Sequence, residues 1–138
     1  MVDFSESRYR LRKGKKIVGY MRKISDNMIL YSRDSFWWNG SKMNYEEIDE
    51  WTGLRDKNGR TVYEWDIVYY KLDPDAADRE GVILWEENRQ TFGIRDIHSE
   101  LFIPLALDGL AMFNERQLKV FSYLFLNPEL KERLGIKD

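Results

Sequence analysis

The chain has 138 residues, of which 33% are charged, a formal net charge of -2 and no cysteine. This length suits a single domain, residues 1–138, built around one core. The lack of cysteine excludes disulfides, thiolate catalysis and cysteine-ligated metal sites. No apolar run is long enough to span a bilayer and the N-terminus has no apolar signal-peptide core, so we expect a cytoplasmic protein without a membrane partner. Residues 1–7 are expected to form a flexible leader.

The charges are distributed unevenly along the chain. The first 23 residues carry a balance of +6, and the remaining residues carry -8. From residue 8 arginines alternate with Tyr9 and Leu11, which is the period of a half-buried strand. Lys13-Gly14-Lys15 predicts a turn, and residues 17–21 predict the returning strand. Residues 8–22 are therefore predicted to form a hairpin whose outer face is cationic.

This basic hairpin gives the sharpest functional signal. Its cations could lie along a phosphate backbone or enter a groove as a β-ribbon. The charges could instead keep an exposed edge strand from pairing with another chain, or bind an acidic protein. The candidate nucleic-acid-binding residues are Arg8, Arg10, Arg12, Lys13, Lys15 and Lys16.

The rest of the N-terminal region, within residues 8–50, predicts further short strands. We expect strands at Met28–Tyr31 and Phe36–Trp38, with a polar turn at residues 32–35 between them. Neighbouring residues of a strand face opposite sides, so either Trp37 or Trp38 should be partly exposed and available to a protein partner. Residues 41–50 are compatible with a helical turn or with an extended connection, and both stay open.

The clearest local pattern lies in residues 51–70. The tetrapeptide Asp56-Lys57-Asn58-Gly59 has the residues of a tight reversal, because Asn and Gly tolerate positive φ and Asp accepts from the downstream backbone. Residues 61–63 and 67–70 are β-branched or aromatic, so each predicts a strand.

The remaining elements follow in the same manner. A surface loop at residues 72–80 is predicted to precede strands at residues 81–85 and 91–95. Asp108-Gly109 predicts a hairpin, and residues 118–125 predict a closing strand. A helix is expected at residues 129–134, with Asn127 as its N-cap, Pro128 in its first turn and Gly135 as its stop. The fold is therefore mainly β, either a small partly open β-barrel or packed sheets built from hairpins, with a short C-terminal helix.

The residues offer little support for catalysis. His98, the only histidine, has a serine beside it that would point to the opposite strand face, so a surface or capping role is expected. Acids gather between Asp73 and Glu80, but such loops are usually only solvated. Neither a phosphate-binding loop nor a dinucleotide fingerprint is present. We expect no enzyme, no catalytic residue, no cofactor and no metal.

Several motifs together resemble the YopX-like proteins of bacteriophages and prophages. They are Thr52 to Gly59, Val62-Tyr63-Glu64, Asp66-Ile67-Val68, Gly81 to Trp85, Val120 to Tyr123 and Asn127 to Leu130. The resemblance implies a β-rich fold and a mobile-element origin, for a family without an established activity. Trp65 occupies a position that is usually glycine, so the turn there has either ordinary negative φ or a differently built bend.

These observations lead to one expected function and one alternative. The expected function is a non-catalytic phage or prophage binding protein that contacts nucleic acid through the basic hairpin. The alternative is a protein-interaction or oligomerisation module that modulates a host or phage protein, with contacts near Trp37 and Trp38. Within the single domain, the expected parts are N-terminal hairpins at residues 8–50, a YopX-like core at 51–126 and the helix at 127–134.

Overall fold

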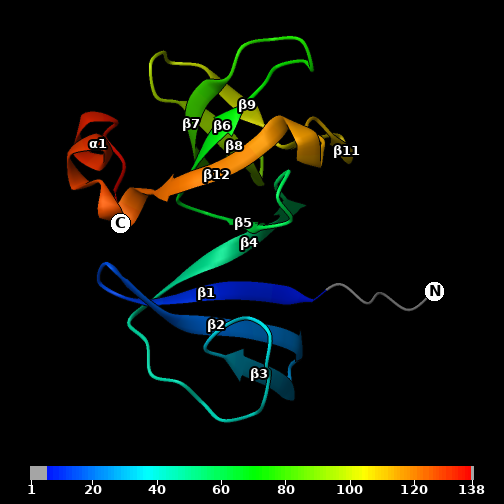
Figure 1. Ribbon diagram of the computed structural model, residues 1–138, viewed down its shortest axis with the longest axis vertical. Helices are drawn as coiled ribbons and strands as arrows, with labels where there is room; N and C mark the ends of the chain where they lie inside the picture. The colour runs from blue at the N-terminus through cyan, green and yellow to red at the C-terminus, as the bar shows by residue number, and fades with distance from the viewer. Residues whose placement is uncertain (1–5, 138) are drawn as a thin grey trace. The chain divides into compact units, whose positions relative to one another are not determined.

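The computed structural model describes residues 6–137, and the chain divides into two compact units, Met1–Trp51 and Thr52–Asp138. The regular structure of both is mainly antiparallel strands, drawn as arrows in Figure 1. The strand β4 (Glu47–Arg55) contains the boundary between the units. Most of the expected leader, residues 1–5, lies outside the described residues, and β1 already begins at Ser7.

The first unit is a sheet of strands in the order β3-β2-β1-β4. Its strands β1 (Ser7–Lys13) and β2 (Lys16–Ser25) form the predicted hairpin, shown in blue in Figure 1. Gly14 has φ +59 in the connecting turn, a conformation that glycine adopts at little cost. The third strand, β3 (Met28–Ser32), confirms the next predicted strand.

One face of this sheet forms a small apolar core. Tyr9 pairs with Met21 and Met21 pairs with Tyr31, so a row of large side chains crosses three strands. Leu11 is fully buried in the same cluster, and Met43 packs against it. The alternation of residues 8–12 therefore predicted correctly which side chains of β1 enter the apolar core.

The prediction of a strand at residues 36–38 is wrong. The segment after β3 is a loop, closed by a single bridge between Tyr31 and Asn39. Side chains take up the backbone donors of this loop: Ser32 Oγ accepts from the Ser35 amide at 2.8 Å, and Asp34 Oδ1 accepts from the Phe36 amide at 2.8 Å. Such local bonds compete with a strand ladder. Of the two alternatives for residues 41–50, the extended one is correct, because β4 starts at Glu47 without a helix before it.

The second unit holds an open antiparallel sheet in the order β12-β6-β7-β8-β9. The turn at Asp108-Gly109 connects β10 to β11 as predicted. The mainly β prediction is thus confirmed, with sheets that do not close into a barrel. The elements are β5 (Thr61–Tyr63), β6 (Asp66–Tyr70), β7 (Arg79–Glu86), β8 (Thr91–Asp96), β9 (Phe102–Pro104), β10 (Ala106–Leu107), β11 (Leu110–Ala111), η1 (Glu115–Gln117), β12 (Leu118–Tyr123), η2 (Leu124–Leu126) and α1 (Pro128–Arg133).

Apolar clusters lie on both faces of β6. Val68 belongs to a cluster with Ile83 and Ile94, whereas Ile67 belongs to another with Val82 and Leu124. Both Ile67 and Val68 are buried, as the continuous apolar run of this strand predicted.

The predicted turn at residues 56–59 is held by a buried carboxylate. Asp56 Oδ1 accepts from the amides of Asn58 and Arg60, each at 2.9 Å. Asp56 Oδ2 accepts from the Val120 amide at 2.9 Å, so the turn is joined to β12. A local turn signal therefore also fixes a contact between distant segments.

The bend before β6 keeps a left-handed backbone although it carries tryptophan. Trp65 has φ +73, so the alternative of an ordinary negative φ is wrong. Its amide donates to the Ile83 carbonyl at 2.8 Å, and its carbonyl accepts from the Leu124 amide at 2.8 Å. These bonds to two neighbouring segments hold the residue in a conformation that L-amino acids disfavour.

The C-terminal helix α1 begins at Pro128, and Gly135 has φ +70 just beyond its end. Both signals were predicted. Asn127 occupies the N-cap position, but its side chain does not cap the helix. It instead donates to the Tyr123 carbonyl at 2.7 Å and to Ser122 Oγ at 3.1 Å.

Candidate functional site

Two arginines of the basic hairpin are buried in ion pairs. Only 2% of Arg10 and 3% of Arg12 is exposed. Pairing of β1 with β4 sets Arg10 opposite Asp49 and Arg12 opposite Glu47. Asp49 Oδ2 accepts from Arg10 Nε at 2.9 Å and from Arg12 Nε at 2.8 Å. The expectation that all three arginines form an exposed cationic face is therefore wrong for these two, because a distant carboxylate faces them.

Arg8 is also paired, although it is less buried. Its Nε atom lies 2.7 Å from Glu6 Oε1, and its guanidinium lies 5.4 Å from the ring centre of Trp51. Glu6 additionally accepts from Arg22 Nη2 at 2.8 Å. Burial raises the pKa of the Glu6 carboxyl, but hydrogen bonds from Arg22 and Arg8 outweigh that effect and lower the pKa overall.

The remaining candidate cations are exposed at the end of the hairpin. We call Lys13, Lys15 and Lys16 the lysine tip. Within residues 6–137 the structure gives their ammonium groups no salt-bridge partner. Three like charges within four residues create a local positive potential that favours an anionic partner.

The two tryptophans proposed for protein contact have different surroundings. Trp37 is 81% exposed and its neighbour Phe36 is 83% exposed. Trp38 is half-buried, with the guanidinium of Arg22 5.2 Å from its ring centre. Only Trp37 of the pair therefore presents most of its ring to solvent. We call residues 33–38 the aromatic loop.

Hydrogen bonds within the aromatic loop fix the backbone that carries these rings. Asp34 Oδ1 accepts from the amides of Phe36 at 2.8 Å and Trp37 at 3.1 Å. These two backbone hydrogen bonds hold the pKa of the Asp34 carboxyl below its ordinary value. Ser35 completes the bend with φ +70. The exposed rings thus stand on a backbone that is ordered by these hydrogen bonds.

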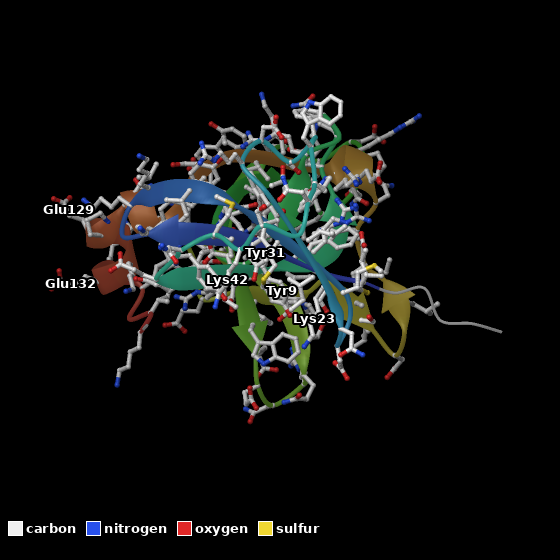
Figure 2. All side chains as sticks on the ribbon, turned by 90° about the horizontal axis from the view of Figure 1, so that it is seen from below. Tyr9, Lys23, Tyr31, Lys42, Glu129 and Glu132 are labelled. Atoms are coloured by element: carbon white, nitrogen blue, oxygen red, sulfur yellow. The ribbon has the colours of Figure 1, made fainter. Side chains whose placement is uncertain are left out.

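A groove of about 420 Å³ lies beside the aromatic loop. Tyr31 and Trp37 line it together with polar residues. Figure 2 labels Tyr31 and Lys42, two of the lining side chains, near Tyr9 on the first unit. The groove has two cations in its lining, Arg33 and Lys42, and both are exposed.

A separate polar cluster lies in the second unit. Asp96 is 2% exposed and accepts from the Tyr70 hydroxyl, from the His98 amide at 2.9 Å and from Ser99 Oγ at 3.1 Å. Arg79 Nε lies 3.3 Å from the same carboxylate. Donors thus reach both oxygens of Asp96, and the cluster links β6, β7 and β8. Sequence reasoning missed it, because no local pattern shows that Tyr70 and Asp96 meet.

The pKa values of this cluster are shifted. Burial, the hydrogen bond to Asp96 and the charge of Asp96 together raise the pKa of Tyr70 to about 12. Burial also raises the pKa of Asp96, but hydrogen bonds from Tyr70 and the His98 amide lower it overall. The imidazole of His98 itself is exposed and lies 2.8 Å from Glu80 Oε1.

Residues 6–137 contain no group of three or more histidine, aspartate or glutamate side chains placed to hold a metal ion. No helix among them has both the length and the apolar content to cross a membrane.

A comparison with protein families gives a match to the family model described as YopX protein, over residues 5–132. The chain belongs to the YopX family. No curated protein matches its sequence. In this YopX protein the motifs that carry the resemblance serve the fold, since Asp56 holds a turn and Asp66 Oδ2 accepts from the Tyr63 amide at 2.8 Å. The lysine tip and the aromatic loop lie in the N-terminal part of the matched region.

Proposed function

We propose that this YopX protein is a non-catalytic binding protein of phage or prophage origin, acting in the cytoplasm, and that it contacts the phosphates of a nucleic acid through the lysine tip. The observation that carries the proposal is the exposure of three ammonium groups without an ion-pair partner among the described residues. Their positions follow from the paired strands β1 and β2. Lysine ammonium groups bind phosphates and release condensed counterions, which favours association.

The ion pairs of the arginines limit the size of this contact. Arg10 and Arg12 bind Asp49, so neither is available to phosphate without breaking a buried pair. Three lysines predict a log–log salt slope of about -2 on a single strand and about -3 on a duplex. If all six hairpin cations bound phosphates of a duplex, the slope would be about -5. The salt dependence therefore measures how many cations take part.

The test is fluorescence anisotropy of a labelled oligonucleotide over a series of salt concentrations. The tip variant is Lys13→Gln, Lys15→Gln and Lys16→Gln together. The control variant replaces three exposed lysines of the second unit, Lys57→Gln, Lys119→Gln and Lys137→Gln, and so has the same net charge. On a duplex the tip variant should bind weakly with a slope near zero, whereas the control should bind like the wild type. Equal losses in both variants would show only a dependence on net charge and would refute the proposal.

A protein partner is the second candidate function. It is favoured by Phe36 and Trp37, since large aromatic side chains on a fixed surface are frequent centres of protein interfaces. The partner would be a host or phage protein or a second copy of this chain. Sedimentation of the purified protein tests the second copy, and a pull-down at high salt with Phe36→Ser/Trp37→Ser as control tests the other partners. A single sedimenting monomer and identical pull-downs would exclude this function.

A further inference from the structure

We propose that the groove beside Trp37 binds an unpaired base of a single-stranded nucleic acid, which stacks on the indole ring while Arg33 and Lys42 contact the adjoining phosphates. The inference deepens the proposed function and rests on it, since it names the kind of nucleic acid and a second contact. It uses residues outside the lysine tip. The two contacts can therefore be tested separately.

The ring of Trp37 has the properties of a stacking surface. It is 81% exposed and lines the groove. The Asp34 carboxylate fixes the backbone on which it stands, through the bonds to the Phe36 and Trp37 amides. A side chain on a backbone that is ordered before binding loses less conformational entropy when a ligand stacks on it.

The polar groups of the groove favour an anionic ligand that accepts hydrogen bonds. Arg33 and Lys42 are exposed, and the structure shows no salt bridge for either within residues 6–137. Asn39 Oδ1 accepts from the Ser41 amide at 2.8 Å, which leaves the Asn39 amide nitrogen as a donor. Asp34 Oδ1 accepts from donors of its own loop, including Ser32 Oγ at 3.1 Å, and the charge of this carboxylate leaves the lining with a balance of +1. The groove thus presents donors and positive charge.

The topology of the sheet places the groove toward the lysine tip. Ser32, the last residue of β3, pairs with Tyr20 of β2. Because β3 runs antiparallel to β2, it ends in the direction of the β1–β2 turn. Tyr20 and Lys16 are four residues apart on β2, which corresponds to about 13 Å along the strand. One strand of nucleic acid can therefore contact the lysine tip with its phosphates and the groove with a base.

Stacking on a protein ring selects single strands. In a duplex the base faces are covered by neighbouring bases, whereas an unpaired base can be placed on an aromatic side chain. A protein side chain entering the groove is the competing occupant. The donors and cations of the lining favour the nucleic acid over an apolar side chain, and the experiment below separates the two.

The experiment compares three fluorescent probes by anisotropy: an oligothymidine, an abasic strand of equal length and a duplex. Trp37→Ala should bind the oligothymidine about 5- to 140-fold more weakly, which corresponds to the usual energy of stacking one base on an aromatic ring. Its affinity for the abasic strand should equal that of the wild type, since only phosphates are bound there. Trp37→Phe, which retains an aromatic face, should restore most of the loss. Leu110→Ala is the control for truncation of an exposed apolar side chain.

Each outcome has a defined meaning. Equal binding of the oligothymidine by wild type and Trp37→Ala would refute the stacking site. The tip variant would still test whether the lysine tip binds phosphates. Equal weakening of the oligothymidine and the abasic strand by Trp37→Ala would assign Trp37 a structural role and also refute it. If the wild type binds none of the probes, the proposed function fails together with the inference. Capture of a protein that depends on Trp37 would then assign the groove to a protein partner.

Discussion

Arg10 and Asp49 lie opposite each other in the pairing of β1 with β4, and Arg10 Nε donates to Asp49 Oδ2 over 2.9 Å. Arg12 binds the same carboxylate through two nitrogen atoms, Nε to Oδ2 at 2.8 Å and Nη2 to Oδ1 at 3.0 Å. All three side chains are buried. Two of the arginines that give the N-terminal region its basic sequence thus join two strands inside the first unit.

Replacement of Asp49 by asparagine should strongly destabilise the protein. Removing one partner of a buried ion pair leaves uncompensated charge, and the usual loss is about 3–5 kcal/mol in the free energy of unfolding. Urea denaturation followed by circular dichroism measures this loss. The control is Glu47→Gln, because half of the Glu47 side chain is exposed and its pair with Arg12 should contribute less than about 1 kcal/mol. Similar losses in both variants would contradict a structural role for Asp49.

The left-handed backbone of Trp65 predicts an unusual order of two substitutions. Trp65→Ala and Trp65→Gly both remove the indole, which packs against the cluster of Ile67, Val82 and Leu124 and lies 4.8 Å from Lys131 Nζ. Alanine keeps the disfavoured positive φ, whereas glycine adopts it without that cost. The glycine variant should therefore be more stable than the alanine variant by about 1 kcal/mol, although glycine is usually the more destabilising residue. Thermal unfolding of both variants measures the difference, and a more stable alanine variant would disprove the argument.

The Tyr70 hydroxyl should make stability depend on pH in the alkaline range. Its pKa is about 12 in the folded protein and 10.0 ordinarily, so folding favours the protonated phenol. The resulting stabilisation is complete below pH 10 and is lost as the pH rises through 12. The unfolding free energy of the wild type should thus fall more steeply between pH 10 and 12 than that of Tyr70→Phe. Tyr45→Phe, at an exposed tyrosine, should retain the wild-type slope. Parallel curves for all three proteins would contradict the prediction.

Asp96 should produce the opposite dependence in the acid range. Its pKa is below the ordinary 3.8 in the folded protein, so folding favours the carboxylate. The stabilisation is present above the ordinary pKa and is lost as the pH falls through the lower, folded one. Urea denaturation between pH 5 and about 2 should show a weaker acid dependence for Asp96→Asn than for the wild type. Asp26→Asn, with a side chain 98% exposed, should match the wild-type slope, and an unchanged slope for Asp96→Asn would count against the prediction.

Local residue chemistry predicted the strands and turns that it controls. The turns at Gly14, Asn58-Gly59 and Asp108-Gly109 have the expected positive φ at their glycines. The same reasoning failed for residues 36–38, whose aromatic residues favour a strand. There the side chains of Ser32 and Asp34 take the amides that a strand ladder would use. Propensity describes each residue alone and does not include this competition.

The candidate site was predicted only in part, because exposure depends on residues far away in the chain. The arginines of residues 8–12 have the alternation of an exposed strand face. Asp49, which binds two of them, lies 39 residues after Arg10. The lysine tip was predictable, since a turn between paired strands is ordinarily exposed. The groove beside Trp37 was not, because it depends on the bridge between Tyr31 and Asn39.

Replacing Asp56 by its isostere asparagine should destabilise the protein. Its two oxygens accept three backbone hydrogen bonds, from Asn58, Arg60 and Val120. In Asp56→Asn one oxygen becomes an NH₂ group, so in either orientation of the amide a donor faces a backbone donor. At a side chain only 1% exposed, an amide left without its acceptor costs about 1–3 kcal/mol, and thermal unfolding should show a loss of that size. Asp75→Asn in the exposed loop before β7 should stay within about 0.5 kcal/mol of the wild type. If the two variants unfold alike, Asp56 does not join the turn to β12 energetically, and the family-signature turn would be stabilised by its backbone alone.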